Sequence, residues 1–142
     1  MARKAIARAE HWIGTQDATL RALHPSGATT MLKVFGFLTK REDLETQAFI
    51  DYYENHHVPL VLSLAPTPAK YKRNYLVRGD EFNKEEGKID FDVITELVFP
   101  DRAAFIDWIE KLSVEAVGAD EEKFLDRSRT RACVIEEHVT SS

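Results

Sequence analysis

The hydrophobic residues of this chain follow two different spacings. In some segments apolar and polar residues alternate with a period of two, as in strands, and in others apolar residues recur every three or four positions, as in helices. The strand-like segments are residues 31–38, 71–78, 89–99 and 130–139. The helix-like segments are residues 44–57, 102–112 and 119–125, and Asp101 is placed to cap the second of them.

With the two pieces at 102–125 taken together, the order of elements is β-α-β-β-α-β. This order predicts an α+β, ferredoxin-like fold in which a four-stranded antiparallel sheet has its helices on one face. The strands nevertheless carry apolar side chains on both faces, for example Phe35 and Phe37 against Val34 and Leu38. A sheet that is apolar on both sides needs a second cover. We therefore expect a homodimer through the open sheet face, with a barrel-like lumen between the two sheets.

The end of the first predicted helix is the chemically richest segment. Phe49, Tyr53 and His57 are four residues apart and form one ridge of the helix, while Tyr52 and His56 lie on the neighbouring ridge. Phenols and imidazoles donate hydrogen bonds or move protons near neutral pH. Because His56 points roughly 100° away from His57 around the helix, both histidines cannot easily face one cavity.

The helix is expected to end close to these histidines. Pro59 disfavours helical geometry at Val58, which predicts that the helix stops within about one residue of His57. At a helix C-terminus the backbone carbonyls carry partial negative charge, and this favours a protonated imidazole. The segment therefore indicates a site for proton transfer.

Composition narrows the class of protein. With 142 residues, 44% hydrophobic and 30% charged, the chain fits one soluble domain. No apolar run reaches the roughly 18 residues of a membrane helix, and a net charge of −5 argues against nucleic acid as the partner. One cysteine, Cys133, excludes an internal disulfide and suits the cytoplasm; we expect it in the core of the last strand. No spacing resembles a zinc site or a nucleotide-binding loop, so no metal is expected.

Residues 1–30 differ from the rest of the chain. They are basic, predict a short amphipathic helix over about residues 3–13, and end in a linker-like stretch at residues 25–30. We expect an N-terminal helical extension and linker over residues 1–30, followed by the main domain over residues 31–142.

Several segments, taken in order, resemble the EthD family, which is named after a protein tied to ethyl tert-butyl ether degradation and is part of the dimeric α/β-barrel superfamily. The resemblance covers about residues 31–139. It is carried by Met31–Lys40, by Phe49, Tyr52 and Tyr53 followed by His57–Leu60, by Pro66–Tyr71 with Asn74, by Ile94–Phe99 and by Glu121–Val139. The leader over residues 1–30 departs from the family's usual pattern.

The resemblance implies a cofactor-free homodimeric α+β barrel. It matches the family's usual histidine to His57, which precedes a Val-Pro-Leu segment, and makes His56 an addition. Relatives in the wider superfamily include polyketide cyclases, dehydratases, lactone isomerases and small monooxygenases. Membership therefore narrows the fold more than the reaction.

His57, His56 and Tyr53 are the candidates for catalysis. A neutral imidazole accepts a proton and its conjugate acid returns it, as enolisation and dehydration require. A tyrosine hydroxyl can donate a hydrogen bond to a carbonyl as it becomes an enolate. The alternatives are a histidine that caps backbone carbonyls, a histidine in a surface contact, and a tyrosine on the packed face of the helix.

Tyr52, Asn74, Glu96 and Arg73 are the candidates for substrate binding. Asn74 and Glu96 fall within predicted strands, where an unpaired buried polar atom is costly, so lining the lumen would explain them. Alternatively, Glu96 pairs with Lys33 or Arg73. Arg73 could hold an acidic or phenolate substrate, or lie at a solvated strand edge.

Together with these residues, the resemblance implies a cofactor-independent enzyme of the lyase or cyclase type that acts on a small aromatic or polyketide-like molecule. Dehydration, cyclisation or isomerisation would proceed with His57 moving the proton beside an aromatic lumen that excludes water. One alternative is a cofactor-free monooxygenase of phenolic or anthrone-like substrates. Another is a non-catalytic barrel that binds a hydrophobic ligand or haem in a stress response.

Overall fold

The computed structural model describes residues 31–85 and 89–141 of the chain. The extension predicted over residues 1–30 lies outside the described residues. The elements, in order, are β1 (Leu32–Leu38), α3 (Thr46–Tyr52), the π-helix η1 (Tyr53–His57), α4 (Val58–Leu64), β2 (Lys70–Tyr75), β3 (Val93–Phe99), α5 (Arg102–Leu112), α6 (Glu115–Glu121), the 3-10 turn η2 (Arg127–Arg129) and β4 (Arg131–Ile135).

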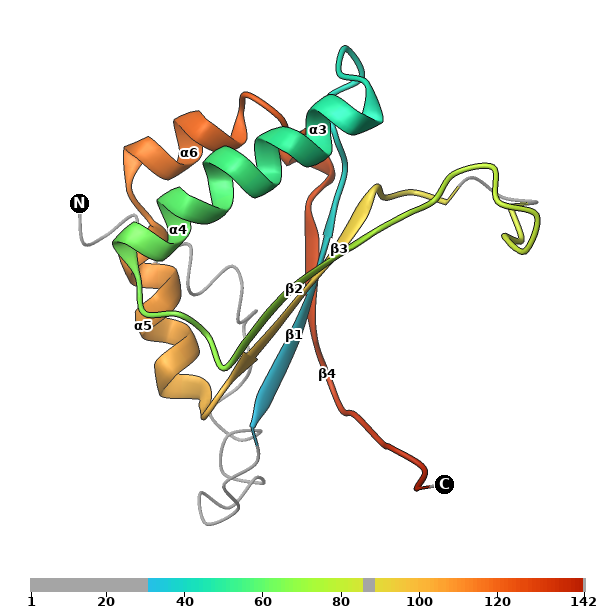
Figure 1. Ribbon diagram of the computed structural model, residues 1–142. Coiled ribbons are helices and arrows are strands. Elements are labelled where there is room, and N and C mark those ends of the chain that lie inside the picture. Colours follow the sequence, from blue (N-terminus) through green and yellow to red (C-terminus); the bar gives the residue numbers. More distant parts are fainter. Residues whose placement is uncertain (1–30, 86–88, 142) are drawn as a thin grey trace.

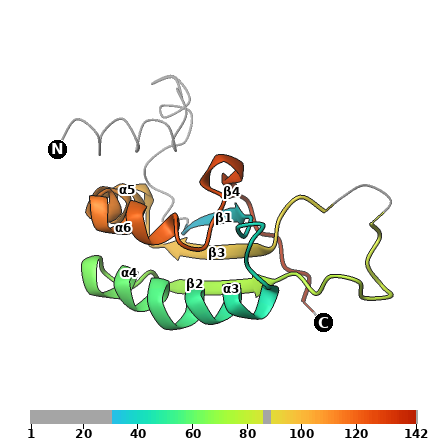
Figure 2. The same ribbon diagram turned by 90° about the horizontal axis from the view of Figure 1, so that it is seen from above.

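The four strands form one antiparallel sheet in the order β2-β3-β1-β4. Figures 1 and 2 show the labelled helices together on one side of this sheet. The α+β, ferredoxin-like fold predicted from the sequence is therefore confirmed. The other side of the sheet, which we call the open face, has no helix over it in the described part of the chain.

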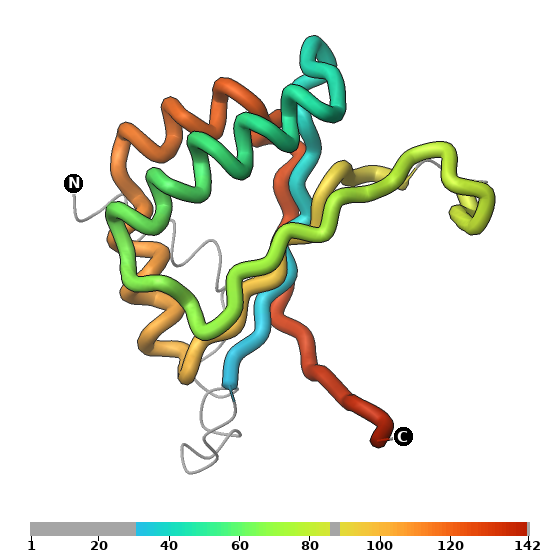
Figure 3. The backbone as a smooth tube through the Cα atoms, viewed as in Figure 1, coloured from blue at the N-terminus to red at the C-terminus, as the bar shows by residue number. Residues whose placement is uncertain are grey.

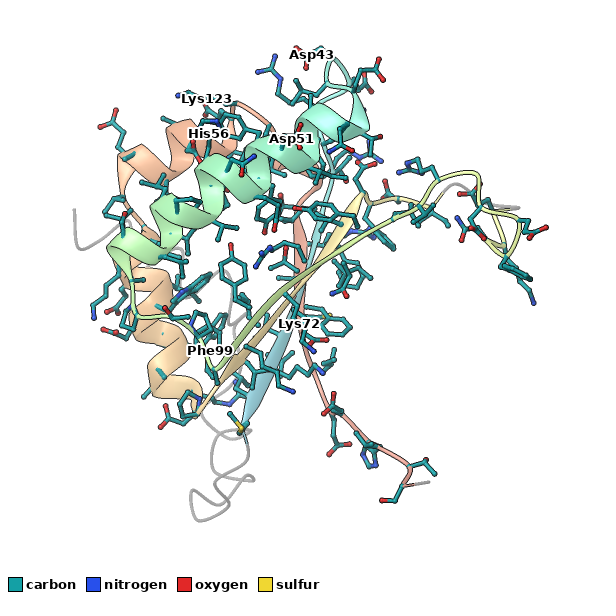
Figure 4. The ribbon with its side chains drawn as sticks, in the orientation of Figure 1. Asp43, Asp51, His56, Lys72, Phe99 and Lys123 are labelled. Atoms are coloured by element: carbon teal, nitrogen blue, oxygen red, sulfur yellow. The ribbon has the colours of Figure 1, made fainter. Side chains whose placement is uncertain are left out.

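The alternation along β1 and β3 decides which side chains meet the helices. Val34 pairs with Leu97 across the two central strands, and both are buried under the helices. Their neighbours Phe35 and Glu96 pair in the same way but lie on the open face and are half-buried. In Figure 4, Phe99 points towards the helices and Lys72 points the opposite way.

Three apolar clusters join the helices to the sheet and to one another. Helix α5 packs on the start of β1 and the end of β3. The α3–η1 segment packs on the start of β3 and on the residues that follow α6. Helix α4 packs against α5 and α6. The buried members are, for the first cluster, Leu32, Val34, Leu97, Phe99, Phe105 and Ile109; for the second, Phe49, Tyr53, Val93, Phe124 and Leu125; and for the third, Val61, Ala65, Leu112 and Val117.

The prediction that the first helix ends at the two histidines is wrong. Helical structure runs on from η1 through α4, with Pro59 at its second residue, and ends at Leu64. A wider turn precedes the proline: the N–H of Val58 donates to the carbonyl of Tyr53, five residues back. The helix continues because its last turns bury Val61 and because the proline lies where a new helical segment begins. The histidines therefore lie inside a helical segment and not at a helix C-terminus.

Other element boundaries differ less from the prediction. Helix α5 has the predicted bounds, and the Asp101 side chain accepts a hydrogen bond from the N–H of Ala104. Strand β3 begins at Val93 rather than at residue 89, and β4 ends at Ile135. Helix α6 begins and ends about four residues earlier than expected.

The prediction that Cys133 is a core residue is also wrong. Cys133 is exposed, because β4 is an edge strand with β1 as its neighbour, and its open-face side chains have no cover among the described residues. None of the helices in residues 31–85 and 89–141 has the length and apolar character needed to cross a membrane.

Between β2 and β3 the chain leaves the sheet as an extended projection, which Figure 3 shows as a tube leading away from the helices. Its base is held by Arg78, whose guanidinium donates to the Asp92 carboxylate at 3.0 Å and to the Phe91 carbonyl at 2.8 Å. This clamp explains why residues 89–92 do not continue β3 as predicted.

Candidate functional site

His57, Asp120 and Tyr52 meet where the α3–η1 segment lies beside α6. The Nδ1 atom of His57 is 2.9 Å from Oδ2 of Asp120. The Tyr52 hydroxyl donates to the other carboxylate oxygen, Oδ1, at 2.6 Å. One carboxylate therefore holds an imidazole and a phenol at once.

This geometry fixes the state of the neutral His57 ring. A carboxylate can only accept hydrogen bonds, so Nδ1 carries the proton when it faces Asp120. In the neutral ring the lone pair is then on Nε2, which is the atom free to take up a proton. Asp120 also stabilises the imidazolium that would form, as the carboxylate does in a histidine–aspartate pair of a hydrolase.

An aromatic wall surrounds the His57 ring. The Phe124 ring lies 4.9 Å away and the Tyr53 ring 5.3 Å away, measured between ring centroids. Phe124 is fully buried and touches the rings of Tyr52, Tyr53 and Phe49 as well. The side chains of His57 and Asp120 keep 10% and 12% of their exposure, so the pair lies at the margin of the core rather than inside it.

His56 takes the other side of the helix, as the spacing predicted. It is exposed, and its ring stacks on the Tyr52 ring at 4.8 Å with an interplanar angle of 29°. Figure 4 labels it on the outer surface of the α3–η1 segment. Of the two histidines, the buried one is His57.

Tyr53 points to the sheet. Its hydroxyl lies 2.7 Å from Oγ1 of Thr95 on β3, and both residues are buried. Burial raises the pKa of Tyr53 to about 12, against the opposing effect of the Thr95 hydrogen bond. Burial, followed by the hydrogen bond to Asp120, likewise raises the pKa of Tyr52 to about 12. Both phenols therefore remain protonated donors at neutral pH.

Arg73 is bound to a carboxylate of the helix. Its guanidinium makes a bidentate pair with Glu54, at 2.8 Å from Nε and 2.7 Å from the terminal nitrogen, and its Cζ atom lies 4.7 Å from the centroid of the Tyr71 ring. Tyr75 also donates to Glu54, at 2.7 Å. The Arg73 hydrogen bond holds the pKa of Glu54 below its usual value. Arg73, one of the two partners considered for Glu96, is therefore paired with Glu54 instead.

Asn74 and Glu96 lie on the open face, opposite His57. The Asn74 amide donates to the Ile94 carbonyl at 3.0 Å and is exposed. Glu96 pairs with Lys33 at 3.3 Å and with Lys72 at 3.6 Å. The structure thus brings Tyr52, Tyr53 and Arg73 to the helix-covered side with His57, and leaves these two residues on the other. The expectation of one chamber in the lumen beside His57 is wrong, because the sheet separates the imidazole from the open face.

Asp120 was missed by the sequence analysis. It lies 63 residues from His57, and no spacing rule pairs residues so far apart. The available signal was weak: an acidic residue inside a predicted helical piece, next to the family-like segment that starts at Glu121. The fold is what brings the two side chains together.

Two surface hollows lie away from this cluster. One is formed by the turns at residues 41–43 and 122–127, and the other lies on the open face around Phe37 and Cys133. Within residues 31–85 and 89–141, no group of three or more His, Cys, Asp or Glu side chains is arranged to hold a metal ion. We therefore assign none of the candidate residues as a metal ligand.

Comparison with known proteins agrees with the architecture. A family model described as the EthD domain matches residues 41–128. The chain is similar to the crystal structure of an ethyl tert-butyl ether D (EthD) family protein from Bacillus halodurans, with 23% identity, coverage of 77% of this chain and 100% of that chain, and a TM-score of 0.57. No curated protein sequence matches the chain. The family match spans more than half of the sequence and the structural match supports the fold, so the chain belongs to the EthD family.

Proposed function

We propose that this protein is a cofactor-independent enzyme that moves protons on a small aromatic or polyketide-like molecule, in a dehydration, cyclisation or isomerisation. The observation that supports this most is the hydrogen bond from Nδ1 of His57 to Asp120. It leaves Nε2 as the base and provides a negative partner for the imidazolium. A positioned imidazole of this kind contributes roughly 10²–10⁴-fold to a proton-transfer rate.

The residues can be given distinct roles. Nε2 of His57 removes a proton from a carbon next to a carbonyl, the electron pair moves onto the carbonyl oxygen, and the imidazolium later returns a proton. Tyr52, the half-buried phenol that shares the Asp120 carboxylate with His57, donates a hydrogen bond to that oxygen when substrate replaces Asp120 as its acceptor. Tyr53, whose hydroxyl is engaged by Thr95, holds the imidazole through ring contact.

The surroundings of His57 favour an aromatic substrate. Tyr52 and His56 form a stacked pair beside the margin where His57 and Asp120 retain exposure. A flat ring can extend this stack and bring its acidic carbon to the imidazole, with offset-stacked contacts worth about 0.5–1.5 kcal/mol beyond area burial. Substrate would therefore enter from the edge between η1 and α6.

We also propose that two copies form a homodimer through the open face. Phe35, Phe37 and Ile94 lie there without helix cover among the described residues, although helices cover the opposite face of the same sheet. A contiguous apolar surface of this kind on a folded domain marks an interaction site. Isologous pairing of the face with itself buries these side chains in one step.

Proton transfer can be tested before the natural substrate is known. Native mass spectrometry of freshly purified protein would first identify any retained ligand. That ligand, or a panel of aromatic 1,3-dicarbonyl compounds, is then incubated with protein in D₂O, and exchange of the acidic C–H is followed by proton NMR. Wild-type protein is expected to accelerate exchange, and His57→Ala to reduce the acceleration roughly 10²–10⁴-fold.

His138→Ala is the matched control, because His138 is an exposed histidine of the C-terminal tail. It should exchange at the wild-type rate. Binding without exchange in the wild-type protein would favour a ligand-binding barrel, and an unchanged rate in His57→Ala would remove His57 as the base. Loss of exchange under anaerobic conditions would indicate an oxygenase instead.

A further inference from the structure

The tip of the projection between β2 and β3 presents a phenylalanine to solvent. Phe82 is 86% exposed, the most exposed of the large apolar side chains in the described residues. We call residues 76–85 the arm. Figures 1 and 2 show that it leaves the sheet on the side away from the helices, which is the side of the open face.

The tip of the arm is held in one shape. The Asp80 carboxylate accepts from the N–H of Phe82 at 2.9 Å, and the Asp80 carbonyl accepts from the N–H of Asn83 at 3.0 Å. The Asn83 amide donates to the Val77 carbonyl at 2.7 Å, and Gly79 supplies the positive φ of 78° that the turn requires. These bonds fix the backbone so that the ring of Phe82 stands outside.

The second of the two hollows, which we call the Cys133 hollow, offers an apolar site of matching character on the open face. It has a volume of about 460 Å³, and its lining residues are Phe37, Ile89, Asp90, Phe91, Arg131, Ala132 and Cys133. The rings of Phe37 and Phe91 meet edge to face at 5.4 Å. A third aromatic ring can join such a pair in the same geometry.

Charge is complementary as well. Arg129 and Arg131 share one acid, Asp90, at the rim of the hollow, which leaves an excess positive charge there. The arm tip carries Asp80, Glu81 and Glu85 against Lys84, which leaves an excess negative charge. Arg78 is already paired with Asp92 at the base of the arm. An arm tip from another copy would therefore meet a rim of opposite sign.

Two-fold symmetry brings the two features together. In a dimer closed through the open faces about an axis parallel to the strands, the β2 edge of one copy lies opposite the β4 edge of the other, because the order is β2-β3-β1-β4. The arm follows Tyr75, which pairs with Val93, and the hollow is built around Phe37, which pairs with Ile94 and Arg131, so both are at the same end of the sheet. Stacked sheets are ~10 Å apart, and the three residues between Tyr75 and the Gly79 turn span at most ~10 Å when extended, so the arm can reach across.

From these observations we propose that Phe82 of each copy inserts into the Cys133 hollow of its partner and locks the homodimer. This inference rests on the homodimer proposed above, but not on the reaction or on His57. It assigns a function to the arm: each arm closes the otherwise uncovered β4 end of the opposite open face.

Because Cys133 is the chain's one cysteine, the proposal can be tested by cross-linking. In the full-length Phe82→Cys variant, the sulfur at position 82 should lie within disulfide distance of Cys133 of the partner subunit. Mild oxidation at low micromolar concentration is expected to give a covalent dimer on a non-reducing gel, which reductant reverses. The dimer should disappear in the double variant Phe82→Cys/Cys133→Ser.

Glu110→Cys is the matched control, because Glu110 is an exposed residue of α5 on the opposite side of the sheet. It reports the background rate of collisional cross-linking. Phe82→Cys that remains a dimer by sedimentation yet cross-links no faster than Glu110→Cys would overturn the arm contact while the dimer stands. A monomeric wild-type protein would overturn both, and neither result bears on proton exchange by His57.

A second variant measures the strength of the contact. Phe82→Ala removes an apolar side chain that is buried twice per dimer, so the dimer dissociation constant should rise about 100-fold. Lys84→Ala on the same arm should change it less than about threefold. A Phe82→Ala dissociation constant equal to that of wild type would contradict the proposal, even if the cross-link forms.

Discussion

The helix-covered face and the open face of the sheet are both aromatic, but the tyrosines are confined to the first of them. All four tyrosines of the chain lie on the helix-covered side, where each hydroxyl has a partner to meet: Thr95, Glu54 and Asp120 are among them. Phenylalanines occur on both faces, and the aromatic residues of β1 on the open face are Phe35 and Phe37.

The difference follows from what each face is covered by. A buried hydroxyl without a partner costs free energy, so a tyrosine suits a face whose neighbours are fixed by the same chain. A phenylalanine side chain has no polar atom, so none is left without a partner when the surface of a separate molecule covers it. The helix-covered face can therefore position chemistry, while the open face is suited to association. Four experiments sharpen or break this contrast.

The largest effect on stability is expected for Phe124→Ala. Phe124 is fully buried among Phe49, Tyr52, Tyr53 and His57, and removal of such a ring from a core costs about 3–5 kcal/mol of unfolding free energy. Urea unfolding followed by circular dichroism measures it. Phe37→Ala on the open face should cost less than half as much. Equal losses would show that the two faces are packed alike.

The next effect concerns assembly. Ile94→Asp places a charge in the middle of the open face, and burying that charge against a second copy is costly, so the dimer dissociation constant should rise at least about 100-fold. Sedimentation velocity over a dilution series measures the change. The unfolding free energy of the monomer should move by about 1 kcal/mol or less. A variant that dimerises like wild type would exclude the open face as the interface.

Alkaline pH should act on the helix-covered face. Burial raises the pKa of Tyr52 and Tyr53 to about 12, and it raises the pKa of Tyr71 and Tyr75 as well, whereas an unfolded tyrosine titrates near pH 10. Because the folded pKa is the higher one, this stabilisation is complete below about pH 10 and is lost as the pH rises towards about 12.

Absorbance of tyrosinate against pH, recorded with circular dichroism, checks this. The folded protein should show little tyrosinate below about pH 10, and its appearance should accompany unfolding. The urea-denatured chain, which titrates normally, is the control. Four tyrosines that ionise near pH 10 in a chain that stays folded would contradict the proposed burial of these hydroxyls.

The smallest effect distinguishes single hydrogen bonds on the two faces. Tyr53→Phe leaves the buried Thr95 hydroxyl without its 2.7 Å partner and should cost about 1–3 kcal/mol. Asn74→Ala removes an exposed amide on the open face and should cost about 0.5 kcal/mol or less. Thermal unfolding of both variants compares them. A larger loss for Asn74→Ala would mean that this amide is buried in the assembled protein.

Local sequence signals were sufficient where a structure depends on neighbouring residues. Helix α5 has the bounds predicted from Asp101 and the apolar spacing, because an N-cap and one buried stripe are both local. Phe49, Tyr53 and His57 form one ridge of the helix as the four-residue spacing predicted, and the structure shows that this ridge is buried. The element order led to the correct α+β fold, since the sheet topology follows from short connections.

Predictions failed where distant residues decide. The helix continues past Pro59 because Val61 packs against Leu112 and Val117. The rules for proline consider only neighbouring residues, so they do not include this contact. Cys133 is exposed because β4 is an edge strand, and edge position is a property of the whole sheet.

The sequence by itself therefore determined the kind of fold, the helix ridge that carries the imidazole, and the apolar character of both sides of the sheet. Only the tertiary structure decided that His57 lies on the helix-covered side, that Asp120 is its partner, and that Asn74 and Glu96 are separated from it by the sheet. The physical reason is the range over which each feature is decided. The periodicity of side chains is set by the backbone within one helical turn or one pleat. The pair of His57 and Asp120 instead joins two elements whose separation along the chain does not indicate their distance in space.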